Sequence, residues 1–417
     1  MTIEMKQIEG GGVTAAKGFK AGGIHAGFRK NPGRKDLAMV EADELCSAAG
    51  VFTTNVFCAP CVTFSKEQLG QGNAGVARAV VINSGIANAA TGVRGLEDAR
   101  KTAEIAADAI GCGSEDVLIA STGVIGVFLP MEPFETGIPA LHQQVSVEGG
   151  HDAACAIMTT DTISKEVAFS YVSQAPGYEG TVFTVGGMSK GSGMIMPNMA
   201  TMIAVMTTDA PLTPAAAHQA LVDAVNCSFN KITVDGDTST NDTCLLLASG
   251  KAAPGAPAIS NVESAAYQEF LVVLKHACTT LAKIMAKDGE GATKLVTVKI
   301  ECAATDEDAD KAARTVANSP LVKTAVAGHD ANWGRVAGAL GRSGAKFRQE
   351  DVDIDILGLP VCRGGMSVAF DEDEALRRFE ADEIVLYCNL HAGDAATTMW
   401  TCDFTHDYIS INGDYRS

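Results

Sequence analysis

Two apolar runs that each end in a polar, glycine-containing turn constrain the fold of this chain most. The runs at 80–82 and 117–120 are followed by Asn-Ser-Gly and Ser-Thr-Gly at 83–85 and 121–123. Short, uniformly apolar runs of this kind predict buried strands that each deliver a polar turn. Because helical patterns lie between such runs, the sequence predicts an α/β fold with a mixed sheet rather than a regular βαβ array.

The first 294 residues contain further strand and helix signals. Residues 166–173 and 181–185 alternate like the two arms of a hairpin,. Helices are expected at 98–110, at 213–226 with Pro214 near its start, and at 264–287, where apolar residues recur every three or four positions,. Gly289 is expected to cap the last of these helices. This part of the chain, 1–294, is interpreted as one catalytic core.

The pattern changes after residue 294 and indicates a second, smaller α/β domain at 295–400. Strands are expected at 295–300 and 352–356, and helices at 306–316 and 373–379,. The remaining residues, 401–417, form a C-terminal tail, in which 408–411 is expected to be a short strand.

Composition and charge exclude several classes of protein. The net charge is −18, with 32 basic and 50 acidic residues, and no run of Lys and Arg marks a nucleic-acid surface,. The first residues lack the apolar core of a secretory signal, and no stretch of ~18 apolar residues predicts a membrane span. We therefore expect a cytoplasmic protein that binds neither nucleic acid nor membrane.

The sequence gives little support for a metal site. Among 12 cysteines only Cys58 and Cys61 form a C-x-x-C pair, and a zinc ribbon would need a second pair,. The Asp- and Thr-rich segment 232–243 lacks the spacing and terminal Glu of a calcium loop. We interpret the cysteines as free thiols and the segment 232–243 as structural support, with no metal and no bound cofactor.

The segment 185–209, VGGMSKGSGMIMPNMATMIAVMTTD, has two interpretations. In one, it is a flexible glycine loop between two strands, with methionines that pack the core. In the other, Thr201 follows a strained turn, attacks the carbonyl of Ala200, and becomes a new N-terminus. Such a threonine carries a hydroxyl nucleophile and an α-amino base in one residue. A Walker A phosphate loop fits poorly, because Lys190 is followed by glycine.

Nine motifs in one order decide between these interpretations. They are KGFKAGGIHAG (17–27), VINSGIANAATG (81–92), ASTGVIG (120–126), AIMTTDT (156–162), GGMSKGSGMIMPNMATM (186–202), ITVDGDTSTNDT (232–243), DGEGATK (288–294), ANWGR (331–335) and TCDFTHDYISINGDYRS (401–417). On these motifs the chain resembles the ornithine acetyltransferase family nearly end to end. It departs from many members at Ala90, where they have Cys, and at Ser417, where they have Thr.

The resemblance implies an N-terminal-nucleophile-like mixed α/β sandwich that cuts itself between Ala200 and Thr201. The two pieces would stay together as α and β chains in an α2β2 or larger assembly. The implied reaction belongs to arginine biosynthesis: a glutamate N-acetyltransferase and ornithine acetyltransferase moves acetyl from N2-acetylornithine to glutamate through an acetyl-Thr201 ester. Some members also use acetyl-CoA as a co-substrate, and no motif here separates the two kinds.

The resemblance also implies roles for individual residues. Thr201 would be the nucleophile, Thr122 and Gly123 the oxyanion hole, and Lys190 a substrate-binding cation. Glu290 would pair with the substrate ammonium or assist proton transfer.

Three further positions are implied to contact substrate. Thr159 is the best match to the family's substrate threonine, with Thr160 and Thr162 as close competitors. Asn412 and Ser417 would lie in a tail that folds over the pocket and keeps water from the ester.

Three other functions compete with this interpretation. An N-terminal-nucleophile aminopeptidase or amidase would share the self-cleavage and transfer the acyl group to water. An amino-acid-binding protein would keep the 200–201 bond intact. A kinase-like protein would bind nucleotide at the glycine-rich segment.

Overall fold

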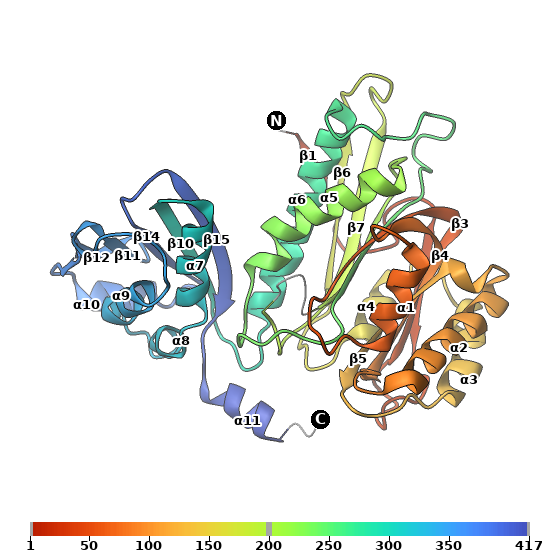
Figure 1. Ribbon diagram of the computed structural model, residues 1–417, viewed down its shortest axis with the longest axis horizontal. Helices are drawn as coiled ribbons and strands as arrows, with labels where there is room; N and C mark the ends of the chain where they lie inside the picture. The colour runs from red at the N-terminus through yellow and green to blue at the C-terminus, as the bar shows by residue number, and fades with distance from the viewer. Residues whose placement is uncertain (1–2, 197–201, 415–417) are drawn as a thin grey trace.

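The computed structural model describes residues 3–196 and 202–414, which are arranged around two separate sheets (Figure 1). Within these residues, nine strands form the larger sheet in the order β1-β6-β7-β8-β9-β3-β4-β5, with β2 paired to β3. Their bounds are β1 Met5–Gln7, β2 Phe19–Ile24, β3 Leu37–Phe52, β4 Ala74–Ile86, β5 Val117–Val124, β6 Lys165–Val172, β7 Val182–Lys190, β8 Ile203–Thr208 and β9 Thr243–Ala248. The expected mixed sheet is confirmed, because β4–β5 and β8–β9 pair in parallel while the neighbouring pairs run antiparallel.

The two central strands of the larger sheet are buried on both faces. In β8, Ile203 and Val205 belong to one apolar cluster, whereas Ala204 and Met206 belong to another. This alternation places successive side chains on opposite faces of the sheet. The first cluster includes α1 Pro60–Leu69, α2 Gly92–Ile110, α3 Glu132–His142 and α4 Gly150–Ile157, and the second includes α5 Pro214–Cys227 and α6 Ala265–Lys287.

The strongest helix signals of the sequence are confirmed. Pro214 is the first residue of α5, and the Thr213 hydroxyl accepts a hydrogen bond from the Ala216 amide at 3.3 Å. The Ser264 hydroxyl caps α6 in the same way. These caps satisfy amides that have no partner within the helix.

Two details near the expected helices were wrong. The helix expected at 98–110 begins earlier, at Gly92, after an N-cap at Thr91. The residue that caps the end of α6 is Asp288 rather than Gly289, whose φ lies outside the left-handed region. Gly289 is needed for space instead, because a Cβ there would come within 2.7 Å of the Cys402 sulfur.

The glycine-rich stretch expected as a loop is strand over much of its length. Gly186 and Gly187 lie in β7, which pairs with β6 and β8 as an antiparallel neighbour of each. A Cβ on Gly186 would come within 2.2 Å of the Gly12 carbonyl oxygen, so these glycines allow close packing,. Their amides are committed to sheet pairing, which disfavours the phosphate-binding interpretation.

A second sheet and its own apolar cluster follow residue 294. Six strands of the described residues form it in the order β13-β12-β11-β14-β10-β15. The bounds are β10 Leu295–Ala303, β11 Asp353–Ile356, β12 Leu359–Arg363, β13 Met366–Ser367, β14 Glu383–Asn389 and β15 Ala395–Cys402, with helices α7 Asp306–Ala317, α8 Pro320–Ala327, α9 Trp333–Gly341 and α10 Glu372–Arg378. The strands and helices expected from the sequence in this part are present.

The end of the chain differs from the expectation. Residues 408–411, expected as a strand, lie in helix α11, His406–Asp414. Tyr408 stacks on Phe404, with ring centroids 4.7 Å apart, and Ile409 is 72% exposed. No strand of the described residues pairs with this segment, and a helix satisfies its backbone groups internally,. Figure 1 shows α11 standing away from the second sheet, below the larger one.

Among the described residues, no helix combines the length and apolar character that a bilayer-spanning segment requires.

Candidate active site

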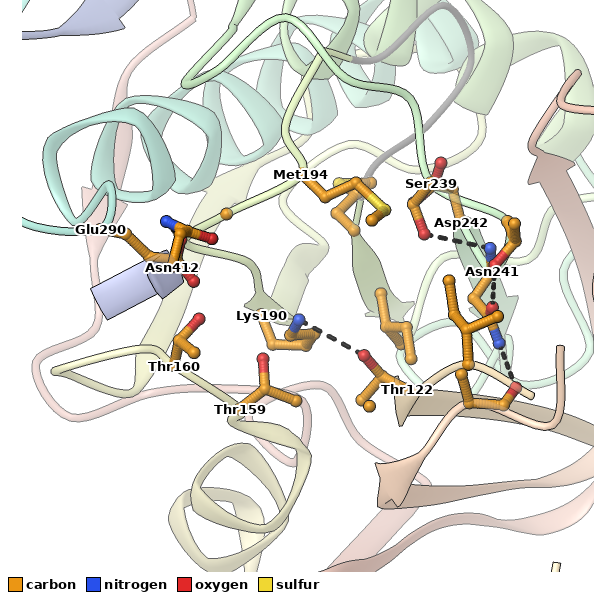
Figure 2. A pocket seen from close by; sticks show the side chains of 17 residues that line it. Thr122, Thr159, Thr160, Lys190, Met194, Ser239, Asn241, Asp242, Glu290 and Asn412 are labelled. Carbon is orange, nitrogen blue, oxygen red and sulfur yellow. Dashed lines mark hydrogen bonds between the residues drawn. The ribbon is translucent and has the colours of Figure 1, made fainter. Parts of the chain in front are cut away.

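A cavity of about 230 Å³ opens where β5 and β7 end and β8 begins (Figure 2). Polar side chains from distant parts of the sequence converge on it. The residues that line it are Ala87, Thr122, Gly123, Ile125, Thr159, Thr160, Lys190, Gly193, Met194, Met202, Ile203, Ser239, Thr240, Asn241, Asp242, Glu290 and Asn412.

Thr122 and Gly123 form one wall of this cavity, at the end of β5. The Thr122 hydroxyl accepts a hydrogen bond from the Lys190 ammonium at 3.4 Å, which leaves its own proton available for another acceptor,. Gly123 pairs with Gly85 in the neighbouring strand and has a φ of +132°. A Cβ at Gly123 would come within 2.2 Å of the Gly85 carbonyl carbon, so only glycine fits,.

Lys190 is the last residue of β7 and is buried, with 8% of its surface exposed. Burial lowers the pKa of its ammonium, and the neighbouring Asp161 carboxylate opposes that effect,. Burial disfavours ionisation of Asp161, but the charges of Lys190 and Lys165 outweigh it and hold the pKa of Asp161 below its usual value. The cavity therefore contains a cation that is supported by a buried carboxylate.

The structure distinguishes between the three threonines that the sequence offered as a substrate contact. Thr159 and Thr160 line the cavity. The Thr159 amide donates to the Asp161 carboxylate at 2.9 Å, which orients this loop. Thr162 does not line the cavity and instead donates its hydroxyl to Asp288.

Glu290 and Asn412 form the side of the cavity opposite Thr122. Glu290 is buried, and its carboxylate accepts a hydrogen bond from the Asn412 side-chain amide at 2.8 Å. Gly193 makes room for this carboxylate, because a Cβ there would lie 2.4 Å from its carbon and oxygen atoms. Figure 2 shows Glu290 and Asn412 side by side, with Lys190 between them and Thr122.

The segment that was expected only to support the site contributes directly to it. Ser239, Thr240, Asn241 and Asp242 all line the cavity. The Asn241 amide donates to the carbonyl oxygens of Ser121 at 2.8 Å and of Ala87, which ties this segment to the end of β5. Its density of hydroxyl, amide and carboxyl groups was the one signal in the sequence that could have identified it.

Asp242 is the most unusual group in this segment. It is fully buried, and burial raises the pKa of its carboxyl well above the usual value despite hydrogen bonds from the Met202 amide and from Ser239 and Thr53. Sequence reasoning missed this group: Asp242 adds to the cavity wall a carboxyl whose ionisation is disfavoured by burial.

Three of the expected site residues, Ala200, Thr201 and Ser417, lie outside the described residues. Met202, which directly follows Thr201 in the sequence, lines the cavity. Its carbonyl accepts a hydrogen bond from the Thr243 amide at 2.9 Å, at the point where β8 begins to pair with β9. The described part of the expected site thus meets at one cavity.

Within residues 3–196 and 202–414, no three His, Cys, Asp or Glu side chains gather in a way that would hold a metal ion. Cys58 and Cys61 are free cysteines, and burial raises the pKa of the Cys61 thiol to about 11. A thiol with such a pKa stays protonated near neutral pH and is a poor metal ligand.

Comparison with known proteins places the chain in a family. The sequence model of the ArgJ family matches residues 20–417. The chain belongs to the ArgJ family. An arginine biosynthesis bifunctional protein ArgJ from Symbiobacterium thermophilum is 50% identical over 408 residues, which cover 98% of this chain and 99% of that protein. A protein of the same name from Caldanaerobacter subterraneus subsp. tengcongensis is 44% identical over 99% of this chain and 100% of its own length.

Two solved structures are also similar to this chain. The arginine biosynthesis bifunctional protein from Bacillus halodurans is 39% identical, with a TM-score of 0.43, and covers 48% of this chain and 100% of that one. The ornithine acetyltransferase from Mycobacterium tuberculosis, solved as a complex with ornithine, is 38% identical, with a TM-score of 0.42, and covers 47% of this chain and 100% of that one. The two mixed sheets of the described residues agree with the mixed α/β fold expected from the sequence.

Proposed function

We propose that this ArgJ-family chain is the acetyltransferase of arginine biosynthesis that moves acetyl from N2-acetylornithine to glutamate. One observation carries the proposal: the cavity brings Lys190, Thr122 and Glu290 to Met202, the residue that follows Thr201. In this proposal the chain cuts itself between Ala200 and Thr201, and Thr201 becomes the nucleophile.

The first half-reaction forms an ester on Thr201. Its hydroxyl oxygen attacks the acetamide carbon of N2-acetylornithine, and its α-amino group takes the hydroxyl proton. The oxyanion accepts hydrogen bonds from the Thr122 hydroxyl and the Gly123 amide, each such donor being worth about 3–4 kcal/mol in comparable sites. The C–N bond then breaks, and the proton passes to the departing amine of ornithine.

The charges of the cavity fit an α-amino acid with a cationic side chain. Lys190 would hold the α-carboxylate, which both substrates share. Glu290 would face the side-chain ammonium of ornithine, and its hydrogen bond from Asn412 fixes the orientation of the carboxylate. Of the neighbouring threonines, Thr159 and Thr160 both border this space.

The second half-reaction returns the enzyme to its starting state. The amine of glutamate attacks the acetyl-Thr201 ester, the C–O bond breaks, and the threonine hydroxyl regains a proton. Such a ping-pong sequence requires that water be kept from the ester. The tail that carries Asn412 and Ser417 would serve this purpose by covering the cavity.

Intact mass under denaturing conditions tests the cleavage first. We expect two fragments, one ending at Ala200 and one beginning at Thr201, and a single chain from Thr201→Ala. Thr201→Ser, which keeps a hydroxyl, is the matched control and should still be cut. A wild-type protein that stays a single 43.1 kDa chain would refute the mechanism.

Product analysis tests the chemistry. The purified protein is incubated with N2-acetylornithine in the presence and absence of glutamate, and N-acetylglutamate and acetate are quantified. N-acetylglutamate that forms only with glutamate supports transfer, whereas acetate formed equally in both reactions supports the rival hydrolase. Repeating the assay with acetyl-CoA as donor tests the additional use of that co-substrate.

The same proposal covers the assembly and location of the protein. The α and β chains would remain associated in an α2β2 or larger complex, which a native mass measurement checks. The cytoplasmic location expected from the sequence stays a prediction.

A further inference from the structure

A buried lysine outside the cavity links three segments that border it. Lys165, the first residue of β6, has no exposed surface. Its ammonium donates to Asp161 at 2.6 Å and to Asp288 at 2.5 Å, so it bridges carboxylates that lie 127 positions apart in the sequence. A fully buried lysine with this geometry is rare unless its charge is compensated.

Each of these two aspartates contacts a different part of the cavity wall. Asp161 accepts the Thr159 amide at 2.9 Å and the Gly191 amide at 2.7 Å. The Asp288 carbonyl accepts the Ser192 hydroxyl at 2.6 Å, and the Glu290 amide donates to the Ser192 carbonyl at 2.9 Å. Segments 159–162, 190–193 and 288–290 are therefore joined through one ammonium group.

The balance of charge gives Lys165 a second effect. Asp161 and Asp288 both pair with Lys165, and Asp161 also acts on Lys190, together with the carboxyl groups of Asp242 and Glu290. Lys190 already acts on Asp161, and without Lys165 it would be the only one of these two cations left beside that carboxylate. Because ion pairs in a poorly solvated site are strong, Asp161 would then hold Lys190 and compete with a substrate carboxylate.

We propose that Lys165 is a positioning residue that neutralises Asp161 and so keeps Lys190 available to the α-carboxylate of the substrates. This inference rests on the proposed function in one respect, the binding of an α-amino acid at Lys190. It assigns to Lys165 no contact with substrate and no part in bond breaking.

Recognition of the carboxylate is measured directly with a pair of ligands. Ornithine and ornithine amide differ only at the α-carboxyl group, and their dissociation constants are determined by calorimetry on the purified protein without turnover. The ratio of the two constants reports on the carboxylate alone. A general loosening of the cavity weakens both ligands and leaves the ratio unchanged.

Wild type and three variants separate the electrostatic effect from a merely structural one. For wild type we expect ornithine to bind at least about tenfold more tightly than the amide, as for a charge-assisted contact. Lys165→Met should bring the ratio close to one. The double variant Lys165→Met/Asp161→Asn should return it to within about threefold of wild type, as should Asp161→Asn alone, because Lys190 then has no competing carboxylate.

A matched control is Lys231→Met, which breaks a partly buried lysine–carboxylate pair with Asp310 and should leave the ratio unchanged. Chemical denaturation verifies that each variant is folded. If Lys165→Met does not fold, the double variant and Asp161→Asn decide the question. Loss of the carboxylate preference in either of them overturns the inference, because recognition would then need Asp161 itself.

The remaining outcomes are also decisive. A Lys165→Met protein that is folded and keeps the wild-type ratio overturns the inference. Wild type that binds ornithine with the expected preference but transfers no acetyl refutes the proposed function and leaves the variants to test Lys165. Wild type that does not distinguish ornithine from its amide overturns the inference, because no carboxylate subsite then exists.

Discussion

Replacement of Gly123 by alanine tests the geometry of the expected oxyanion hole. The new Cβ would lie 2.2, 2.4 and 2.6 Å from the carbonyl carbon and oxygen of Gly85 and the amide nitrogen of Ile86. These are backbone atoms of the neighbouring strand and cannot move aside like the end of a flexible side chain. The φ of +132° adds a conformational cost for any L-residue,.

The magnitude is obtained by comparison with Gly126→Ala. Gly126 also has a positive φ, +81°, but a Cβ there meets nothing within 4 Å. Positive φ alone costs about 1–2 kcal/mol of stability, which both variants pay. The forced overlap at Gly123 adds about 1–3 kcal/mol. We therefore expect the free energy of unfolding to fall by about 2–5 kcal/mol for Gly123→Ala and by about 1–2 kcal/mol for Gly126→Ala.

Activity should separate the two variants further. Relief of the overlap moves β5 away from β4 and displaces the Gly123 amide, and loss of one oxyanion donor lowers kcat by about 10²–10³-fold. Gly126→Ala should keep a kcat within about threefold of wild type. Urea denaturation and the rate of N-acetylglutamate formation measure the two quantities. A Gly123→Ala enzyme as stable and as active as Gly126→Ala would refute the reasoning.

Three further predictions follow from other contacts of the site. Glu290→Gln should raise KM for N2-acetylornithine about tenfold and change KM for glutamate by less than threefold, because only ornithine brings an ammonium group to that carboxylate; equal changes for both substrates would contradict this. Asn412→Ala should raise KM for N2-acetylornithine by about threefold, because Glu290 loses a hydrogen bond that orients it,. The urea midpoint should not shift, because α11 has no buried residues. A shifted midpoint would show that α11 supports the fold. The pKa of Asp161 lies below 3.8 in the folded chain, so its ion pairs stabilise the fold above pH 3.8 and this stabilisation is lost as the pH falls below that value,. Asp161→Asn should therefore reduce the loss of stability at acidic pH when the free energy of unfolding is measured against pH. An unchanged loss at acidic pH would contradict the assignment.

Much of the fold could be predicted because its signals are local. Proline after a threonine cap marks the start of α5, and the apolar stripe of α6 continues over 23 residues. The short segment 408–411 misled because an apolar, alternating run of four residues is too short to distinguish a strand from a helix. The glycines at 186 and 187 misled for a different reason, since a glycine that permits close packing looks the same in sequence as one that permits a loop.

The site could be predicted only in part. The motifs that the chain shares with its family named Thr122, Lys190, Glu290 and Asn412, and the structure brings all four to one cavity. Asp161 and Lys165 were missed because their importance depends on Asp288, and a single sequence contains no information on that distance. Asp242 was missed because its unusual pKa results from burial, which only the folded chain produces.

The position of these acids also explains part of the large negative charge. Several aspartates are buried or half-buried and do not form a surface for basic partners; their carboxylates accept backbone amides, most of them from loops. The amides, each within 3.3 Å, belong to Ala26, Gly27 and Arg29 at Asp36, to Thr159 and Gly191 at Asp161, to Lys17 and Thr184 at Asp209, to Met194 and Ile195 at Asp235, and to Thr293 and Lys294 at Asp403. A carboxylate in such a position replaces the water that a buried loop excludes.

Two of these aspartates link the site to the segment that is expected to be cut. Asp235 binds the amides of Met194 and Ile195, a few residues before Thr201, and its carboxylate also accepts the Tyr408 hydroxyl of α11 at 3.4 Å. Asp161 binds Gly191 on the other side of the same segment. Residues 191–195 are thus held at one end by the buried Asp161 and at the other by the half-buried Asp235, and Asp235 joins them to the helix that carries Asn412.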